Sequence, residues 1–422
     1  MTSPVLEDLR WRGLLAISTD EAALDAALSA GPVTFYCGFD PTAESLHFGN
    51  LVQLVTMRRL QEAGHHPIAV VGGATGLVGD PSGKSAERVL NDTAVVEAWV
   101  ERIRAQIVHL LPMEGANPAR IVNNLEWTGE LSALAFLRDI GKHFSVARMV
   151  AKEVVATRIS DDGISYTEFS YQILQALDYL ELYRRYGAVL QTGGSDQWGN
   201  LTAGVDLIRR AEGASVHALA TPLVTRADGT KYGKTEAGAI WLDPAMTSPY
   251  AFYQYFLNQA DADVGALLRT FSFRSRSEIE KLEASAREHP ESREAQQVLA
   301  RELTALLHGP DEADRVVAAS RAIFGQGELR ELDDGTLAGV AETLPTGTVS
   351  STASVTDLLL ATGLARSRSD ARRLVGEGGV YLNNQRVSDP EATVAADERL
   401  AGRWLVLRRG KRSVAVAEVA PG

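Results

Sequence analysis

Cysteine is nearly absent from this chain of 422 residues, which contains a single one, Cys37. One cysteine cannot form an internal disulfide, and it rules out a zinc site built from several cysteine thiolates. Histidine is also sparse, and of the eight present only His65 and His66 are neighbours. We therefore expect no structural metal ion in this chain.

The sequence also lacks a hydrophobic run of about 18 residues, the length at which a transmembrane helix is expected. Residues 1–13 lack a basic region followed by an apolar one, which argues against a secretion signal. With 45% hydrophobic and 23% charged residues, the composition is typical of a soluble globular protein. A chain of this length favours two or three domains. We expect a cytoplasmic protein that does not contact membranes.

Positive charge is in deficit over the chain as a whole, because 42 Lys+Arg stand against 54 Asp+Glu. The resulting net charge of −12 argues against a polyanion that contacts the whole surface. The deficit is local, however: residues 351–422 carry 11 basic and 8 acidic groups, whereas residues 1–350 carry 31 and 46. Nucleic acid binds to local patches, so the C-terminal segment remains a candidate for it.

The first half of the chain alternates strand-like and helix-like segments. Short β-branched and aromatic runs predict strands, and each is followed by a segment with helical periodicity. The predicted strands are residues 32–39, 66–73, 119–124 and 187–194. This alternation predicts an α/β fold with a Rossmann-like parallel sheet over residues 1–248, whose ligands bind at the carboxyl ends of the strands.

Four other regions depart from that alternation. A mostly helical insertion, residues 125–186, is large enough to be a candidate oligomer surface. Residues 249–328 have a helical pattern without strands, which predicts a separate α-helical domain. A Gly-, Thr-, Ser- and Asp-rich passage follows and is typical of a linker, over residues 329–352. Residues 353–420 resume with two short helices and then strands, which predicts a small α+β domain.

Two glycine-rich segments imitate nucleotide-binding fingerprints without meeting their spacing. In GDPSGKS, three residues separate Gly79 from Gly83 where a P-loop needs four, and Pro81 removes a backbone donor. The segment GGATGLVG, residues 72–79, does not have the G-x-G-x-x-G spacing of a dinucleotide-binding turn. Neither fingerprint is present.

Two polar segments have the chemistry for holding a polyphosphate. HFGN, residues 47–50, starts a predicted helix, where free backbone N–H groups and the helix dipole favour anions. DGTKYGKTEAG, residues 228–238, places Lys231 and Lys234 in a glycine-bracketed loop that can close over a triphosphate. Taken singly, HFGN also fits a capping segment with a solvent-facing histidine, and the lysine loop also fits a solvated surface turn.

Taken together, HFGN and KYGKT resemble the two signatures of class I aminoacyl-tRNA synthetases, usually written HIGH and KMSKS. Five blocks in family order sharpen the resemblance to bacterial tyrosyl-tRNA synthetases: FYCGFDPTAESLHFGN, GGATGLVGDPSGK, EFSYQILQALDYL, LQTGGSDQWGN and KYGKT. One departure is Asn50, where the general signature ends in histidine. The resemblance implies a homodimeric tyrosine–tRNA ligase that uses tyrosine, ATP and tRNA(Tyr), with residues 136–152 as a candidate dimer interface.

The resemblance also implies which residues hold tyrosine. In SYQILQALDYL, Tyr171, Gln175 and Asp178 share one face of a helix, and periodicity alone would place that face in solvent. In the family this face lines the amino-acid pocket, so Tyr36 and Asp178 would hold the phenol. The α-ammonium group would be held by Tyr171, Gln175 and Asp80.

ATP would lie beside the tyrosine, along GFDPT and GGSDQ. Because the substrate carboxylate is already ionised, its attack on the α-phosphorus needs alignment and hydrogen-bond donors rather than a general base. Gln197 would lie near that carboxylate, Lys84 is a further candidate phosphate contact, and Mg²⁺ would arrive with ATP. The implied ATP-binding and catalytic residues are Asp40, Thr42, Gly49, Gly193, Gly194 and Asp196, together with His47, Asn50, Lys231, Lys234 and Thr235 around the phosphates.

The C-terminal segment resembles the small RNA-binding domain named after ribosomal protein S-four, which occurs at the end of bacterial tyrosyl enzymes. Arginines on one short helix and its approach suit phosphate contacts in structured RNA, although alone they also fit a basic helix face without a partner. The candidate RNA-binding residues are Arg366, Arg368, Arg372 and Arg373.

Two alternatives stay open at this point. One is a tryptophan-charging relative, which the combination of Tyr36 with Asp178 opposes. The other is a non-catalytic RNA-binding protein built on a decayed synthetase, which the intact HFGN and KYGKT segments oppose.

Overall fold

The computed structural model describes residues 3–80, 91–151, 155–156, 159, 163–230, 232–235, 238–410 and 413–420. The chain forms two compact units. Unit 1 comprises Met1–Met246 and Gly265–Ile279, and unit 2 comprises Thr247–Val264 and Glu280–Gly422. The short second piece of unit 1 is therefore an excursion of the later chain back into the first unit. In the described part of the chain, no helix has both the length and the apolar character needed to cross a membrane.

A six-stranded sheet forms the centre of unit 1, in the order β1-β6-β5-β2-β3-β4. The strands from β2 to β6 are mutually parallel, and only the edge strand β1 runs antiparallel to its neighbour. The predicted α/β class with a parallel sheet is therefore confirmed. The strands are β1 (Ile17–Ser18), β2 (Thr34–Phe39), β3 (His66–Val71), β4 (Arg120–Asn123), β5 (Ala188–Gly194) and β6 (His217–Thr221).

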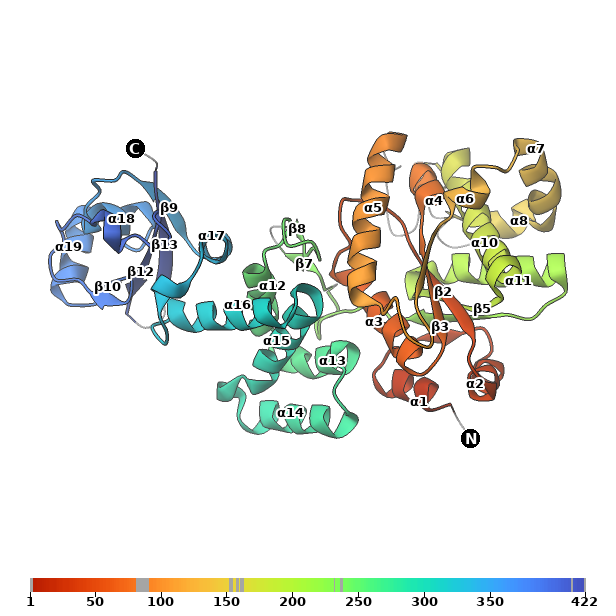
Figure 1. The fold of residues 1–422 in the computed structure, drawn as a ribbon, viewed down its shortest axis with the longest axis horizontal. Helices are drawn as coiled ribbons and strands as arrows, with labels where there is room; N and C mark the ends of the chain where they lie inside the picture. The colour runs from red at the N-terminus through yellow and green to blue at the C-terminus, as the bar shows by residue number, and fades with distance from the viewer. Residues whose placement is uncertain are drawn as a thin grey trace. The chain divides into compact units, whose positions relative to one another are not determined.

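Helices cover both faces of this sheet, with α3 and α5 on one side and α10 and α11 on the other (Figure 1). On the second face, Ile173 and Leu177 of α10 pack with Ile68 and other buried strand residues. A buried aliphatic side chain of this kind stabilises the fold by about 1.5–3 kcal/mol. The described helices around the sheet are α1 (Pro4–Trp11), α2 (Glu21–Ala30), α3 (Phe48–Glu62), α4 (Gly73–Val78), α5 (Thr93–Leu110), α10 (Tyr166–Tyr186) and α11 (Trp198–Glu212).

The predicted insertion between β4 and β5 is helical, as its sequence pattern indicates. Its longest helix, α10, starts where the Ser165 hydroxyl accepts from the Glu168 N–H, and it ends at Gly187, whose φ of 66° favours glycine. Downstream, β7 (Lys234–Thr235) and β8 (Gly238–Ala239) pair as a short hairpin. The shorter elements of the insertion are α6 (Leu125–Thr128), α7 (Ala133–Ala135), the π-helix η1 (Phe136–Ile140), η2 (Gly141–His143) and α8 (Val146–Val150).

Unit 2 begins with helices, as predicted for residues 249–328. Two of them, α13 and α14, are shared between the units, because Gly265–Ile279 belongs to unit 1. Among the described residues of this region no strand interrupts the helices before β9. The helices are α12 (Pro249–Leu257), α13 (Asp261–Phe271), α14 (Arg276–Glu288), η4 (Pro290–Ser292), α15 (Glu294–His308) and α16 (Pro310–Ile323).

The prediction of a linker over residues 329–352 is wrong, because this passage contains regular structure. It includes η5 (Leu329–Glu331), helix α17 (Asp334–Thr343) and strand β9 (Thr346–Val349), and β9 pairs in parallel with β13. The Asp333 carboxylate caps α17 by accepting from the Thr336 N–H at 2.7 Å. An aspartate thus serves here as a helix cap, whereas the abundance of Asp, Ser and Thr had suggested an irregular segment.

The C-terminal part of unit 2 is the predicted small α+β domain. Its five-stranded sheet has the order β11-β10-β12-β13-β9, and two short helices pack on it. The elements are α18 (Val355–Ala361), α19 (Arg368–Gly376), β10 (Val380–Leu382), β11 (Gln385–Arg386), η6 (Ala396–Glu398), β12 (Trp404–Arg409) and β13 (Ser413–Val419).

Candidate active site

A cavity of about 430 Å³ opens in unit 1 where strands β2, β3 and β5 end. The order of the strands reverses between β2 and β5, and such a switch point is where ligands bind in open α/β sheets. Fourteen of the predicted site residues line this one cavity. They are Tyr36, Asp40, Thr42, His47, Gly49, Asn50, Asp80, Tyr171, Gln175, Asp178, Gly193, Gly194, Asp196 and Gln197.

Four other predicted residues cannot be placed in the same way. Lys84 and Lys231 lie outside the described residues. Lys234 and Thr235 form strand β7, and only their backbone is described. Their neighbours Tyr232 and Gly233 line the cavity, so the KYGKT segment reaches it.

Tyr36 of β2 lines the cavity and has a buried hydroxyl. Its side chain is 1% exposed, and its ring packs edge-on against Tyr179 with 5.1 Å between centroids. Its hydroxyl has no hydrogen-bond partner among the residues that the structure describes. Burial, and then the charge of Asp178, raise the pKa of Tyr36 well above its ordinary value. Tyr36 is therefore a neutral donor without an acceptor, which a ligand oxygen could supply.

Asp178 of α10 faces the same cavity and is also buried. Its carboxylate accepts from the indole N–H of Trp127 at 2.8 Å and from the side-chain amide of Asn124 at 3.0 Å. Burial raises the pKa of Asp178 to about 7, although both hydrogen bonds act in the opposite direction. The carboxylate is thus fixed in position and partly ionised near neutral pH.

A continuous polar network connects Asp178 to Asp40. The amide of Asn124 also donates to the Thr75 hydroxyl at 3.0 Å, and that hydroxyl donates to Asp40 at 2.6 Å. The second oxygen of Asp40 accepts from the Tyr171 hydroxyl at 2.6 Å. Asp40, which we predicted beside a nucleotide, therefore holds Tyr171, which we predicted beside an ammonium group.

Glutamine side chains supply further polar groups to the wall. The Gln197 amide donates to Asp80 at 2.7 Å, and Asn200 donates to the Gln197 oxygen at 2.8 Å. The side-chain oxygens of Gln175 and Gln191 are buried and have no partner among the described residues. The side-chain oxygens of Gln175 and Gln191 and the carboxylate of Asp80 can all accept hydrogen bonds. Together they suit a ligand with a positively charged nitrogen.

The HFGN and KYGKT segments both line the cavity and contact each other. The Phe48 N–H donates to the carbonyl of Ile240 at 2.8 Å, and the Leu242 N–H donates to the carbonyl of Leu46 at 2.9 Å. The Phe48 ring lies 6.3 Å from the ring of Tyr232, centroid to centroid. Segments far apart in sequence are thus joined next to the first turn of α3.

Within HFGN, Asn50 fixes the entry to the helix. Its side-chain oxygen accepts from the His47 backbone N–H at 3.0 Å, which leaves its amide N–H₂ as the donating end. Gly49 lies against the His47 ring, and a Cβ atom there would lie 2.8 Å from Cε1 of that ring. Any residue other than glycine would therefore make the imidazole move.

The predicted RNA-binding arginines lie on or beside α19, and those with described side-chain bonds are paired with acids. Arg368 pairs with Asp357 at 2.6 Å, and Arg372 pairs with Glu391 at 3.0 Å. Arg373 contacts Asp370 and Glu377, at 2.7 Å each. The Arg366 backbone N–H donates to Asp370 at 3.1 Å. These side chains are 56–58% exposed, so an RNA phosphate could exchange with the acids.

Sequence reasoning missed three residues that shape the cavity. Asn124 and Trp127, which hold Asp178, follow β4, and Gln191 lies within β5. Asn124 ends a strand of the parallel sheet, which is the one signal that could have identified it. Trp127 and Gln191 carry no such signal.

The chain matches two families. Residues 28–325 match the family described as tRNA synthetases class I (W and Y), and residues 336–417 match the tyrosine–tRNA ligase SYY-like C-terminal domain. The tyrosine–tRNA ligase of Streptomyces avermitilis is 61% identical over 420 residues, which covers 99% of both chains. That of Acidothermus cellulolyticus is 60% identical over 98% of this chain and 99% of its own.

Solved structures agree with these matches. A C-terminally truncated mitochondrial tyrosyl-tRNA synthetase of Aspergillus nidulans superimposes with a TM-score of 0.69 at 30% identity, covering 75% of this chain and 93% of its own. A tryptophanyl-tRNA synthetase of Encephalitozoon cuniculi, bound to tryptophan, reaches a TM-score of 0.54 at 16% identity, which shows a common fold alone. By sequence, domain content and fold, the chain belongs to the tyrosine–tRNA ligases, a family of class I aminoacyl-tRNA synthetases.

Proposed function

We propose that the cavity of unit 1 is where this ligase activates L-tyrosine with ATP, before the tyrosyl group passes to the 3′-terminal adenosine of tRNA(Tyr). The observation that carries the proposal is the pair formed by Tyr36 and Asp178. Both are buried, both line the cavity, and the Tyr36 hydroxyl has no acceptor among the described residues. A phenol bound between them would accept from Tyr36 and donate to Asp178.

This arrangement selects tyrosine over phenylalanine. Phenylalanine would leave the Tyr36 hydroxyl and the Asp178 carboxylate buried without their ligand partner. Each unsatisfied group costs about 1–3 kcal/mol, and a charged group costs more. Asn124 and Trp127 hold the Asp178 carboxylate in position, so it cannot turn away to find another donor.

The α-ammonium group of tyrosine would bind where the unpartnered glutamine oxygen and the acids gather. Asp80 and Gln175 line this part of the cavity, and Asp40 holds the hydroxyl of Tyr171 there. The Gln197 amide, which donates to Asp80, would lie near the substrate carboxylate. That carboxylate would then face the phosphate end of the cavity.

ATP would occupy the end formed by HFGN and KYGKT. The tyrosine carboxylate attacks the α-phosphorus in line and pyrophosphate leaves, so the protein has to align the reactants and stabilise the growing negative charge. The first turn of α3, His47 and the amide of Asn50 are the described donors there, and Mg²⁺ would enter as part of the ATP substrate. The further residues proposed for ATP are Thr42, Gly49, Gly193, Gly194, Asp196, Lys231, Lys234 and Thr235.

Three features outside the cavity complete the proposal. The arginines of α19 would bind tRNA phosphates, with the helical region of residues 249–328 on the anticodon side of the tRNA. The insertion would form a homodimer through residues 136–152, where Leu137 and Val146 are 55% and 65% exposed. The enzyme would act in the cytoplasm.

The decisive experiment is amino-acid-dependent exchange of pyrophosphate into ATP, measured with tyrosine and with each other amino acid. We expect exchange with tyrosine and none with phenylalanine. Exchange with tryptophan in place of tyrosine would favour the tryptophan-charging alternative. A wild type no faster than a Lys231→Ala, Lys234→Ala double variant would favour the non-catalytic alternative.

A further inference from the structure

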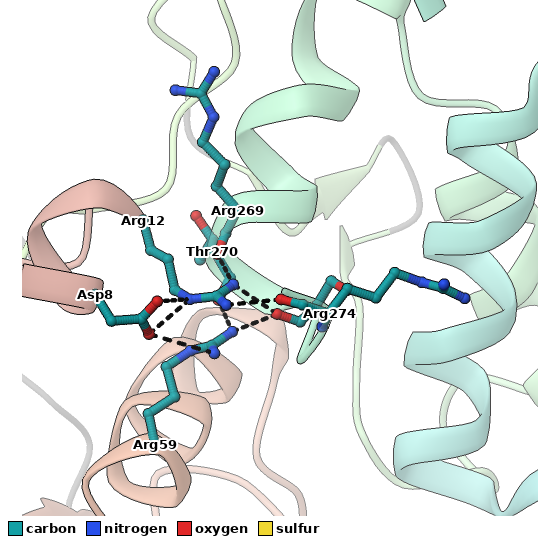
Figure 2. A network of polar contacts seen from close by, with 7 residues as sticks. Asp8, Arg12, Arg59, Arg269, Thr270 and Arg274 are labelled. Atoms are coloured by element: carbon teal, nitrogen blue, oxygen red, sulfur yellow. Dashed lines mark hydrogen bonds and ion pairs between the residues drawn. The ribbon is translucent and has the colours of Figure 1, made fainter. Parts of the chain in front are cut away.

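Two buried arginines of unit 1 hold the C-terminal end of helix α13. Arg12 caps the end of α1 and Arg59 lies on α3, and each is 6% exposed. Figure 2 shows their guanidinium groups side by side, between Asp8 and carbonyl oxygens in and just after the last turn of α13. Arg12 donates to the carbonyls of Arg269 at 3.1 Å, Ser272 at 2.8 Å and Arg274 at 2.9 Å, and Arg59 donates to those of Thr270 at 3.4 Å and Ser272 at 2.6 Å.

The contacts have a clear physical basis. The last carbonyls of a helix lack intrahelical partners, and the negative end of the helix dipole favours cations there. Asp8 accepts from Arg12 at 2.8 Å and lies 3.9 Å from Arg59, so one carboxylate serves two guanidinium groups. Burial, and then the charge of Arg12, lower the pKa of Arg59 to about 9, which still leaves it cationic at neutral pH.

The segment held in this way contacts the phosphate end of the cavity. Phe271 lies between Thr270 and Ser272, and its ring centroid is 4.7 Å from that of Phe48. Both rings are 1% exposed. Phe48 separates His47 from Gly49 in HFGN, and it also packs against Tyr232 of KYGKT. Arg59 is therefore connected to both proposed ATP-binding segments through a chain of contacts. It binds the carbonyls on either side of Phe271, Phe271 packs on Phe48, and Phe48 belongs to HFGN and packs on Tyr232 of KYGKT.

We propose that Arg12 and Arg59 are positioning residues for adenylate formation, which hold Phe271 against Phe48 and thereby keep HFGN in its reactive place. This inference rests on the proposed binding of ATP at HFGN. A displacement of about 1 Å at a reacting centre can slow a reaction about a hundredfold, so a remote packing contact can matter to this degree. A purely structural role would instead lower the melting temperature and leave the kinetics of the folded enzyme unchanged.

The test uses Arg59→Gln and Phe271→Leu in the full chain, with Arg10→Gln as the matched control. Arg10 is an exposed arginine of α1 whose ion pair with Glu21 lies on the surface. Active sites are counted from the burst of tyrosyl-adenylate, so that unfolded molecules do not enter the rates. We expect kcat/KM for ATP to fall about tenfold in both variants, which is about 1.4 kcal/mol of transition-state stabilisation.

Tyrosine binding should be spared, because the ring contact of Tyr36 is with Tyr179 and the hydrogen bonds of Asp178 are with Asn124 and Trp127, none of which belongs to HFGN. We expect KM for tyrosine to stay within about twofold. Arg59→Lys should recover part of the loss, since an ammonium group keeps the charge but cannot form the guanidinium fork. The double variant should be no slower than the worse single variant, because both changes act through Phe48.

Two results would overturn the inference. In the first, Arg59→Gln melts earlier but keeps wild-type ATP kinetics per active site. In the second, the losses for ATP and for tyrosine are equal. If the wild type shows no tyrosine-dependent exchange, the proposed function itself fails, before any variant is compared.

Discussion

The side-chain amide of Asn124 donates to Asp178 at 3.0 Å and to the Thr75 hydroxyl at 3.0 Å. One buried amide thus joins the carboxylate proposed for the phenol to the hydroxyl that holds Asp40. The carboxylate proposed for the phenol and the polar wall proposed for the ammonium group are therefore parts of one network. The predictions on Asp178 and Trp127 follow from it.

Tyrosine affinity should depend on the ionisation of Asp178. Its pKa in the unliganded protein is raised to about 7, and a phenol that donates to it favours the ionised form. We expect KM for tyrosine to be constant above that pH and to rise as the pH falls, by up to about tenfold per pH unit. Steady-state exchange between pH 5.5 and 8.5 would measure this. Asp178→Asn should raise KM at every pH and flatten the profile, and a profile unchanged by this substitution would contradict the prediction.

The stability of the unliganded protein should depend on pH in the opposite direction, because folding favours the protonated form of Asp178. Asp178 has a higher pKa folded, about 7, than its ordinary value of 3.8, so the native state binds the proton more tightly. Its contribution to stability is complete below about pH 4 and is lost as the pH rises through 7. At about 1.4 kcal/mol per pKa unit the loss is a few kcal/mol at most. The free energy of unfolding, measured with urea, should therefore become more favourable to Asp178→Asn relative to the wild type as the pH rises from 5 to 8. An equal difference at both pH values would argue against the raised pKa.

Trp127→Phe should weaken tyrosine binding, although Trp127 is proposed to act on tyrosine only through Asp178. The change removes the indole N–H that donates to Asp178 at 2.8 Å, so the carboxylate loses one of its two described side-chain donors. We expect a loss of about 1–3 kcal/mol in tyrosine binding by calorimetry and a higher pH midpoint for KM. Trp404→Phe is the control, since Trp404 also donates to a carboxylate at 2.8 Å, that of Asp334 in unit 2. Equal affinities for the Trp127 variant and this control would exclude the proposed role.

Much of the site could be predicted because its residues lie in contiguous blocks. HFGN lies a few residues after β2, GDPSGK lies after β3 and the short helix α4, and GGSDQ begins within the end of β5. The topology of a parallel sheet brings such strand ends together. The cavity lining agrees with that expectation at Asp40, Asp80 and Asp196. The face of α10 with Tyr171 and Asp178 is different, since periodicity alone placed it in solvent.

What could not be predicted depends on tertiary packing. Strand β6 reads HALAT, with one β-branched residue, so it gave no strand signal. Trp127 and Arg59 look like ordinary residues of an insertion and of a helix, and only the folded chain brings them to a buried carboxylate or a helix end. The composition of residues 329–352 was misleading, because caps and turns use the same residues as flexible linkers.

Gly49→Ala should impair the ATP step. The added Cβ would lie 2.8 Å from Cε1 of His47 and would push the imidazole away from its present place. We expect adenylate formation to slow by about 10- to 100-fold while KM for tyrosine stays nearly constant. Gly376→Ala is the control, because a Cβ at this helical glycine of α19 meets nothing within 4 Å. Stopped-flow measurement of adenylate formation would decide, and a rate equal to that of the control would contradict the role of His47.

The arginines of α19 should affect tRNA charging but not tyrosine activation. Arg372 and Arg373 are exposed and paired with acids, so RNA phosphates would replace carboxylate partners that water also solvates. Replacing both by alanine should weaken tRNA(Tyr) binding and reduce the slope of log affinity against log salt by about 1–2. Pyrophosphate exchange should not change, because the proposed activation site lies in unit 1 and the exchange needs no RNA. Arg209→Ala, which breaks an exposed pair with Asp206 on α11 of unit 1, serves as the control. Filter binding at several salt concentrations would measure the slope, and an unaltered slope in the double variant would show that these arginines do not contact the RNA backbone.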